Sequence, residues 1–408
     1  MTGRQWLQAR TRQGAWLARM VVAVLLAGVA TAAIVDWALP AAPLAPREPP
    51  QRGPDSQSIE QMAIQGDWIG AWRAIPVAMA RQWRRPGPLA LAVLTGLCWL
   101  AFSLQAIQIR SWRDGRLWAS LAAVALGVWS VWPTLFFGLW QEHRWGLAPS
   151  EELAAGVRYF VLGVGLREEL AKLLALLPLL GWCVARRDEL AALIVGGCVG
   201  IGFAMEENVG YIGSQAASTL GRLLTAAPLH MACTALVGLA AYRACVWPRE
   251  WVLPFAATLA LVAGAHGLYD AFLVVPALVE YNLASTILFI VLIYQFFREL
   301  RPRYVRRGEP ISLTANFLFC TSLAAAATLV YLAAVVGLGP ALDVLVASLL
   351  GQAVMGYLFL RGMPETLGSA RPSPPTDRPQ APAAACGRTP RPRARTPRAA
   401  GRCGRRRR

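Results

Sequence analysis

The chain has 408 residues, of which 56% are hydrophobic, and its mean hydropathy is positive. Such a composition excludes an ordinary soluble domain, because several uncharged runs of roughly 18 to 24 residues are long enough to cross about 30 Å of hydrocarbon. The formal net charge of +17 does not predict nucleic-acid binding, since residues 371–408 carry 12 arginines against one acid, Asp377. This Pro- and Arg-rich tail cannot build a core, and we expect it to be disordered and to contact anionic lipid headgroups.

The first elements in chain order are a basic segment and an apolar run. Residues 1–19 contain four arginines and no acid, and the run 20–39 that follows predicts an uncleaved first span. Residues 40–56 are rich in proline, and residues 58–85 mix tryptophan with polar residues, which is typical of a helix lying at the membrane interface. Further spans are predicted at 88–108, 117–140, 157–184, 190–213, 226–246, 252–276, 282–297, 314–337 and 340–360. The fold class is therefore an all-α polytopic membrane protein with about ten transmembrane helices.

Basic residues between the spans predict the orientation of the chain. Most of them lie in alternate connections, and most of the remaining connections hold almost none; the exception is the group Arg81, Arg84 and Arg85. The positive-inside rule then puts both the N-terminus and the C-terminus in the cytoplasm of a cell, with the chain in the cell membrane. The predicted organisation is a cytoplasmic N-terminus (1–19), N-terminal spans with an extracytoplasmic Pro-rich and interfacial segment (20–150, within it 40–86), a central multi-helix catalytic core (151–300), C-terminal spans (301–361) and a cytoplasmic tail (362–408).

Four central spans carry ionisable residues, whereas the outer spans are nearly free of them. A charged side chain at membrane depth costs at least ~2.5 kcal/mol on insertion scales, so each one needs a reason. Counted from the predicted cytoplasmic end of each span, the polar residues begin after about 14 to 16 residues, or ~21–24 Å. Their agreement in depth predicts one shared site in the outer half of the bilayer. The residues concerned are Glu168, Glu169 and Lys172; Glu206, Glu207, Asn208 and Tyr211; His230; and His266 and Asp270.

Helical spacing predicts which of these side chains pair. Glu168 and Lys172 lie four residues apart and share a face, whereas Glu169 is expected to point about 100° away from Glu168. His266 and Asp270 are also four apart, so the carboxylate can fix the imidazole tautomer. Glycines at 196, 197, 200 and 202 predict close packing of the span that carries Glu207.

These residues resemble the motifs of the PrsW family of intramembrane proteases, which is related to the CAAX-prenyl and bacteriocin-processing endopeptidases. The resemblance covers roughly residues 155–300. It rests on four motifs in order along successive spans, Glu168-Glu169-x-x-Lys172, Gly202-Phe203-Ala204-x-x-Glu207-Asn208-x-x-Tyr211, Pro228-Leu229-His230 and His266-Gly267-Leu268-Tyr269-Asp270.

The resemblance implies cleavage of membrane-embedded protein substrates, such as anti-sigma factors. It implies Glu168 as the base that activates water, with Glu169 beside it, and His230 and His266 as groups that polarise the water or stabilise the oxyanion. Glu207 would orient a histidine or the water. Lys172, Asn208, Tyr211 and Asp270 are supporting residues, with Asn208 a donor to the scissile carbonyl and Asp270 a partner of His266.

Two chemistries fit the residues. In the first, glutamate and histidine activate water without a metal, and this version is favoured, so no cofactor is expected. In the second, His230, His266 and Glu207 bind zinc and Glu168 serves as base. The sequence contains no HExxH motif that would set two zinc ligands on one helix.

Other functions remain open on the sequence alone. A proton- or ion-coupled transporter could use the same Glu, His and Lys residues as a relay, although its polar residues are commonly spread over two related halves. A non-catalytic membrane scaffold is the third alternative. Glu206 is interpreted as an interfacial carboxylate and His143 as a solvated loop residue.

Overall fold

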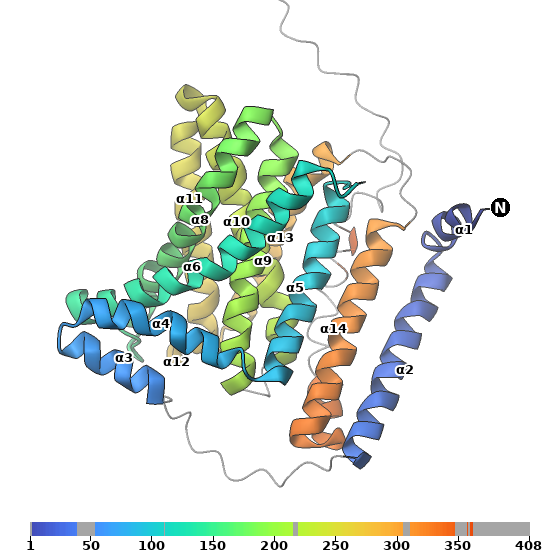
Figure 1. Cartoon of the computed structure of the whole chain (residues 1–408), viewed down its shortest axis with the longest axis horizontal. Coiled ribbons are helices and arrows are strands. Elements are labelled where there is room, and N and C mark those ends of the chain that lie inside the picture. The colour runs from blue at the N-terminus through green and yellow to red at the C-terminus, as the bar shows by residue number, and fades with distance from the viewer. Residues whose placement is uncertain are drawn as a thin grey trace, which may run out of the picture. The chain divides into compact units, whose positions relative to one another are not determined.

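In the computed structural model, all the elements of the described chain are helices (Figure 1). The structure describes residues 2–38, 54–109, 111–214, 219–304 and 311–346, together with 357, 360 and 361. Eight helices in these ranges are long and apolar enough to cross a membrane. They are α2 (Gly14–Ala38), α5 (Pro86–Ala106), α6 (Gly115–Trp145), α9 (Glu189–Ser214), α10 (Thr219–Val246), α11 (Pro248–Val274), α13 (Leu283–Leu300) and α14 (Leu313–Val336). The predicted all-α polytopic membrane fold is confirmed.

The span predicted at 157–184 is built from three consecutive helical segments. These are α7 (Leu153–Arg158), the π-helix η1 (Tyr159–Gly165) and α8 (Leu166–Arg186). Length and composition do not mark α8 as a span, because its first turns carry Arg167 and the Glu168, Glu169 and Lys172 side chains. Wide π-helical turns often occur next to functional residues, and η1 ends directly before this charged stretch.

Part of the predicted organisation lies outside the described residues. Residues 338–346 are helical, at the position of the last predicted span, but most of 347–361 is not described. The Pro-rich linker from 39 to 53 and the Arg-rich tail from 362 onward are also outside the described ranges. The remaining described helices are short: α1 (Gly3–Arg10), α3 (Pro54–Ile64), α4 (Trp68–Gln82), α12 (Pro276–Val279) and η3 (Arg301–Arg303).

Helix α9 lies in the middle of the bundle and packs against α5, α6, α8 and α10. Its glycines allow this close packing, as the sequence predicted. A Cβ atom on Gly200 would overlap the backbone carbonyl of His230 in α10, and one on Gly202 would overlap the carbonyl of Val124 in α6. Because small residues let helix backbones approach without a gap, α9 packs closely on both α6 and α10.

A second close approach joins η1 to α11 beside the polar residues. A Cβ atom on Gly165 would overlap the carbonyl oxygen of Ala263, and one on Gly267 would overlap that of Phe160. Gly165 stands three residues before Glu168, and Gly267 follows His266 directly. The crossing therefore sets the distance between the first turn of α8 and the histidine of α11.

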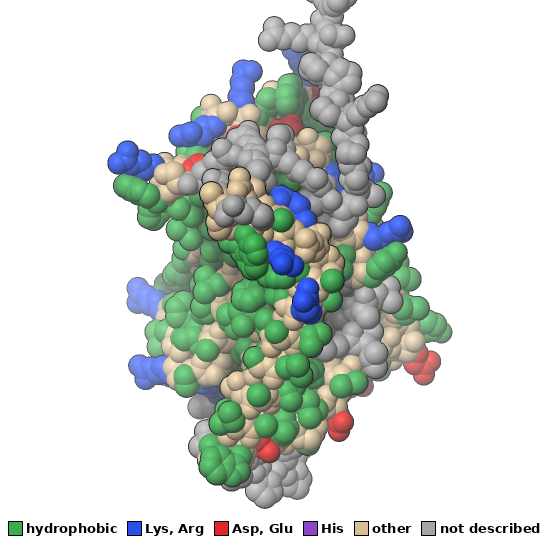
Figure 2. All heavy atoms as spheres, turned by 90° about the vertical axis from the view of Figure 1, so that its right-hand side faces the viewer, with side chains coloured by type: hydrophobic (Ala, Val, Ile, Leu, Met, Phe, Trp, Pro, Cys, Tyr) green, Lys and Arg blue, Asp and Glu red, His purple; other side chains and the backbone are tan. Residues whose placement is uncertain are grey.

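The outer helices α2 and α14 are apolar over most of their length. Helix α14 packs against α2 and α5, and the face that carries α2 and α14 is largely covered by hydrophobic side chains (Figure 2). On α2, Leu26, Ile34 and Trp37 are exposed, as expected of a helix that faces lipid.

The segment predicted to lie at the interface forms the two short helices α3 and α4, next to α6 (Figure 1). Helix α4 buries Ala71 and Ile75 and exposes Ile69 and Val77. Apolar side chains on both its faces suit a helix that contacts protein on one side and lipid on the other.

Candidate active site

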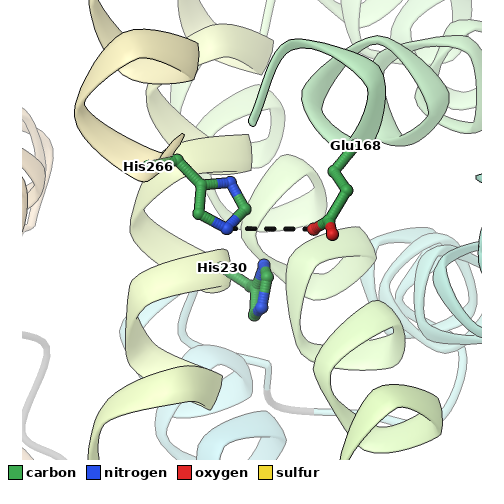
Figure 3. Close-up of side chains that lie close together, drawn as sticks. All are labelled: Glu168, His230 and His266. Carbon is green, nitrogen blue, oxygen red and sulfur yellow. Dashed lines mark ion pairs between the residues drawn. The ribbon is translucent and has the colours of Figure 1, made fainter. Parts of the chain in front are cut away.

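Six ionisable side chains from four helices meet in one group, which we call the polar cluster. The two histidines approach from neighbouring helices and face Glu168 of α8 (Figure 3). Five of the six residues are at most 6% exposed, and the side chain of the sixth, Glu207, is 20% exposed. The convergence expected from the depth of the residues in their spans is therefore observed. The members are Glu168, Glu169 and Lys172 of α8, Glu207 of α9, His230 of α10 and His266 of α11.

Lys172 links both glutamates of α8 to the histidine of α10. Its Nζ atom lies 2.8 Å from Glu169 Oε1, 3.3 Å from Glu168 Oε2 and 2.8 Å from His230 Nδ1. The ammonium also lies 4.1 Å from the centroid of the Phe203 ring, where a cation is attracted to the aromatic face. Because Lys172 is fully buried, these partners replace the water that its charge has lost.

The pairing of Glu168 and Glu169 with Lys172 differs from the expectation. Glu169 was expected to point away from the Glu168–Lys172 pair, but it makes the shorter contact with the lysine. Residues three and four positions before a lysine flank it on either side of the helix, so its long side chain reaches both carboxylates. Glu169 is completely buried, whereas the side chain of Glu168 is 9% exposed.

Hydrogen bonds define the tautomer of His230. The ammonium of Lys172 has donors only, so His230 Nδ1 accepts from it and the ring proton is on Nε2. That Nε2 lies 2.9 Å from Glu207 Oε2 and donates to it. Both ring nitrogens are therefore engaged, and Glu207 orients this histidine.

The tautomer of His266 is the opposite one. Its Nδ1 lies 2.9 Å from Glu169 Oε1, and because a carboxylate accepts, this nitrogen carries the proton. The lone pair is then on Nε2, which lies 3.8 Å from Glu168 Oε2 and 3.7 Å from Asp270 Oδ2. The tautomer is thus fixed by Glu169, and not by Asp270 as the four-residue spacing had suggested.

Two buried oxygen atoms of the motif residues have no hydrogen-bond partner within the described chain. They are Oε2 of Glu169 and Oδ1 of Asn208. Buried polar atoms are normally hydrogen-bonded, so both remain available to a polar group that enters. Tyr211, the other supporting residue of α9, is 40% exposed.

Glu206 and His143, which were predicted to have no catalytic role, lie in different surroundings. Glu206 is 4% exposed, and its Oε2 accepts a hydrogen bond of 2.6 Å from the indole nitrogen of Trp83. His143 belongs to the last turn of α6 rather than to a loop, and it is exposed, as predicted. Sequence reasoning missed the role of Trp83, since nothing in the sequence pairs residues 123 positions apart, and it missed the contact of Phe203 with Lys172.

Donor type and spacing also allow a metal ion. Ligand atoms of Glu168, His230 and His266 lie within 4.8 Å of one another, and imidazole and carboxylate are ordinary zinc ligands. Glu207, part of the zinc set considered from the sequence, instead hydrogen-bonds His230. As the side chains stand, Glu168 and His266 present lone pairs, whereas His230 would first have to exchange its hydrogen bonds with Lys172 and Glu207.

Comparison with known proteins gives one match. The family model described as PrsW family intramembrane metalloprotease matches residues 115–296. No curated protein and no solved structure matches the chain. The match begins at α6, earlier than the motifs, and it supports intramembrane proteolysis and hence a hydrolase. Over residues 115–296, which contain all four motifs and the polar cluster, the chain is therefore similar to PrsW family intramembrane metalloproteases.

Proposed function

We propose that the protein hydrolyses peptide bonds of membrane-embedded segments with a water molecule held between Glu168 and His266. The observation that carries this proposal is the 3.8 Å distance between Glu168 Oε2 and His266 Nε2. Two acceptors this close can each take one hydrogen of the same water at an ordinary hydrogen-bond length of about 2.8 Å. The oxygen lone pairs of that water then face away from both groups, toward a carbonyl carbon.

The proposed reaction moves one proton through Glu168. The carboxylate takes a proton from the water as the water oxygen bonds to the carbonyl carbon, and His266 Nε2 holds the second hydrogen. The C–N bond then breaks, and Glu168 returns its proton to the leaving amine. Glu169 keeps His266 in the required tautomer, Glu207 orients His230, and the Asn208 amide donates to the carbonyl oxygen.

The same cluster suits a metal ion by donor type, with Glu168, His230 and His266 as the residues that would hold it. A bound ion would act as a Lewis acid and lower the pKa of a water ligand. We favour hydrolysis without metal, because both ring nitrogens of His230 are already hydrogen-bonded, to Lys172 and Glu207.

Removal of metal tests this choice. Purified protein dialysed exhaustively against a chelator is expected to keep its cleavage rate within about twofold, since no step depends on a metal. Metal content is measured on the same sample by elemental analysis. Cleavage that disappears with the metal and returns on addition of zinc would contradict the metal-free mechanism.

The substrate class and the orientation follow from the same resemblance and from the charge pattern. We propose membrane-spanning proteins, anti-sigma factors among them, as substrates and lipid as the surrounding partner, with no nucleic acid involved. Both termini lie in the cytoplasm in this proposal, because basic and neutral connections alternate along most of the chain.

The activity itself is tested with a library of labelled single-span peptides, reconstituted with the protein in lipid nanodiscs. The wild-type protein is expected to cleave some members, and His266→Ala to lower the rate about 100-fold, the usual contribution of one positioned proton acceptor. His143→Ala is the matched control, since this histidine is exposed at the end of α6 and should leave the rate unchanged. If no member is cleaved, or if both variants behave alike, the proposed function is wrong.

A further inference from the structure

The short helices α3 and α4 precede the family-matched residues 115–296, yet α4 is attached to that domain at two points. At the first point, Trp132 Nε1 of α6 donates a 2.9 Å hydrogen bond to the carbonyl oxygen of Trp72, and the two rings lie 4.3 Å apart. Trp72 also meets Phe136 edge-on at 4.9 Å. Aromatic pairs at such distances add to simple burial, so the first half of α4 is anchored on α6.

The second point lies directly after the last turn of α4. Here Trp83 Nε1 donates to Glu206 Oε2 over 2.6 Å, which is a short hydrogen bond. The side chain of the preceding residue, Gln82, approaches Gly210 one turn further along α9, with 3.2 Å between Gln82 Oε1 and a Cβ built on the glycine. Residues 82 and 83 therefore contact two successive turns of α9.

The turn of α9 held in this way also carries a member of the polar cluster. Glu206 is followed by Glu207, whose Oε2 is the acceptor of His230 Nε2. Neighbouring residues point about 100° apart on a helix, so the two carboxylates face different partners, one toward α4 and one toward α10. The hydrogen bond from Trp83 to Glu206 therefore restrains the backbone of this turn, and that backbone sets the position of the Glu207 carboxylate.

We propose that Trp83 and Glu206 are positioning residues, which hold the α9 turn so that Glu207 keeps His230 in place. The inference rests on the proposed function for its effect on catalysis, but the restraint itself can be measured without a substrate. In this proposal Glu206 acts as a hydrogen-bond acceptor only, and neither residue touches the peptide that is cleaved.

Three variants separate this role from others. Trp83→Phe removes the donor, Glu206→Leu removes the acceptor, and Glu206→Gln keeps an acceptor oxygen while it removes the charge. Trp132→Phe is the matched control, because it also deletes one indole hydrogen bond to α4 but leaves the contact with Glu206 intact. Two measurements apply to each variant in nanodiscs: hydrogen–deuterium exchange of the amides at 205–212, and kcat and KM for the single-span peptide that the wild-type protein cleaves best.

The expected result is faster exchange at 205–212 in Trp83→Phe and Glu206→Leu, and a kcat about tenfold lower with KM unchanged. Glu206→Gln and Trp132→Phe should match the wild type in both measurements. Unchanged exchange in Trp83→Phe, or a loss in Glu206→Gln as large as in Glu206→Leu, would overturn the inference. If Glu206→Leu does not fold, Trp83→Phe decides. If the wild-type protein cleaves no peptide, the proposed function fails, while the exchange measurement still decides whether the contact restrains α9.

Discussion

Glu168→Gln is expected to lower peptide cleavage by a factor on the order of 10³ to 10⁴, the upper range for a group that transfers the reacting proton. The amide has nearly the shape of the carboxylate and keeps an oxygen toward Lys172, at the place where the wild-type contact measures 3.3 Å. It cannot accept the proton of the water, however. The rate is measured on the peptide library in nanodiscs, beside the thermal stability of the same preparation, which should change little.

A matched substitution on another helix controls for the loss of a carboxylate. Glu250 lies in the first turn of α11 and is exposed, and Glu250→Gln should cleave at the wild-type rate. Glu169→Gln is the more telling comparison. Its amide keeps the oxygen that accepts from Lys172 and His266, but it loses the charge that balances the lysine and puts an NH2 group where the buried Oε2 has no partner, so we expect a lower stability as well as a lower rate. A Glu168→Gln variant that cleaves normally would contradict the assignment of the base.

Lys172→Met is expected to destabilise the fold by about 3 to 5 kcal/mol, the usual effect of removing one partner from a buried ion pair. The substitution keeps a long side chain but leaves the carboxylates of Glu168 and Glu169 without their shared cation. Unfolding is followed by the temperature at which the detergent-solubilised protein loses its single size-exclusion peak, compared with the wild type. Cleavage should be lost with it, since His230 also loses the partner of its Nδ1.

A double substitution distinguishes the ion pair from general packing. If the loss comes from unpaired carboxylates, Lys172→Met combined with Glu169→Gln should be less destabilised than the sum of the two single variants, because part of the penalty disappears with the second charge. Additive losses would show that Lys172 stabilises the protein mainly through its contact with Phe203 and its neighbours. Lys172→Met with a normal unfolding temperature would refute the central role given to this residue.

The sequence was sufficient to predict that the polar residues meet, and the reason is geometric. Successive spans run in opposite directions with a fixed rise per residue, so counting from the basic connections places Glu168, Glu207, His230 and His266 at one depth. Glycines on α9 marked the tight contacts because only residues without a side chain allow them. Both arguments depend on backbone periodicity, which is regular in a membrane helix.

The features that the sequence did not predict depend on which partner each side chain contacts and on contacts between residues far apart in the sequence. Lys172 can reach Glu168 and Glu169 equally by spacing, and only the packed structure shows that Glu169 is shared with His266 while Glu168 stays nearer the surface. The π-helix before α8 breaks the regular count of residues per turn. The hydrogen bond between Trp83 and Glu206 joins the end of α4 to α9, and it arises from tertiary packing alone.

Lys172 is also the only lysine of the protein, since the other 39 of its 40 lysine and arginine residues are arginines. Reagents that acylate primary amines do not react with the guanidinium groups of these arginines at neutral pH. The one side-chain amine of the protein is fully buried among carboxylates and an imidazole. Lys172 would therefore be acylated only in molecules in which the polar cluster has become accessible to solvent. The acylated fraction of the peptide that contains Lys172, measured by mass spectrometry, would report how often this opening happens in an intact membrane.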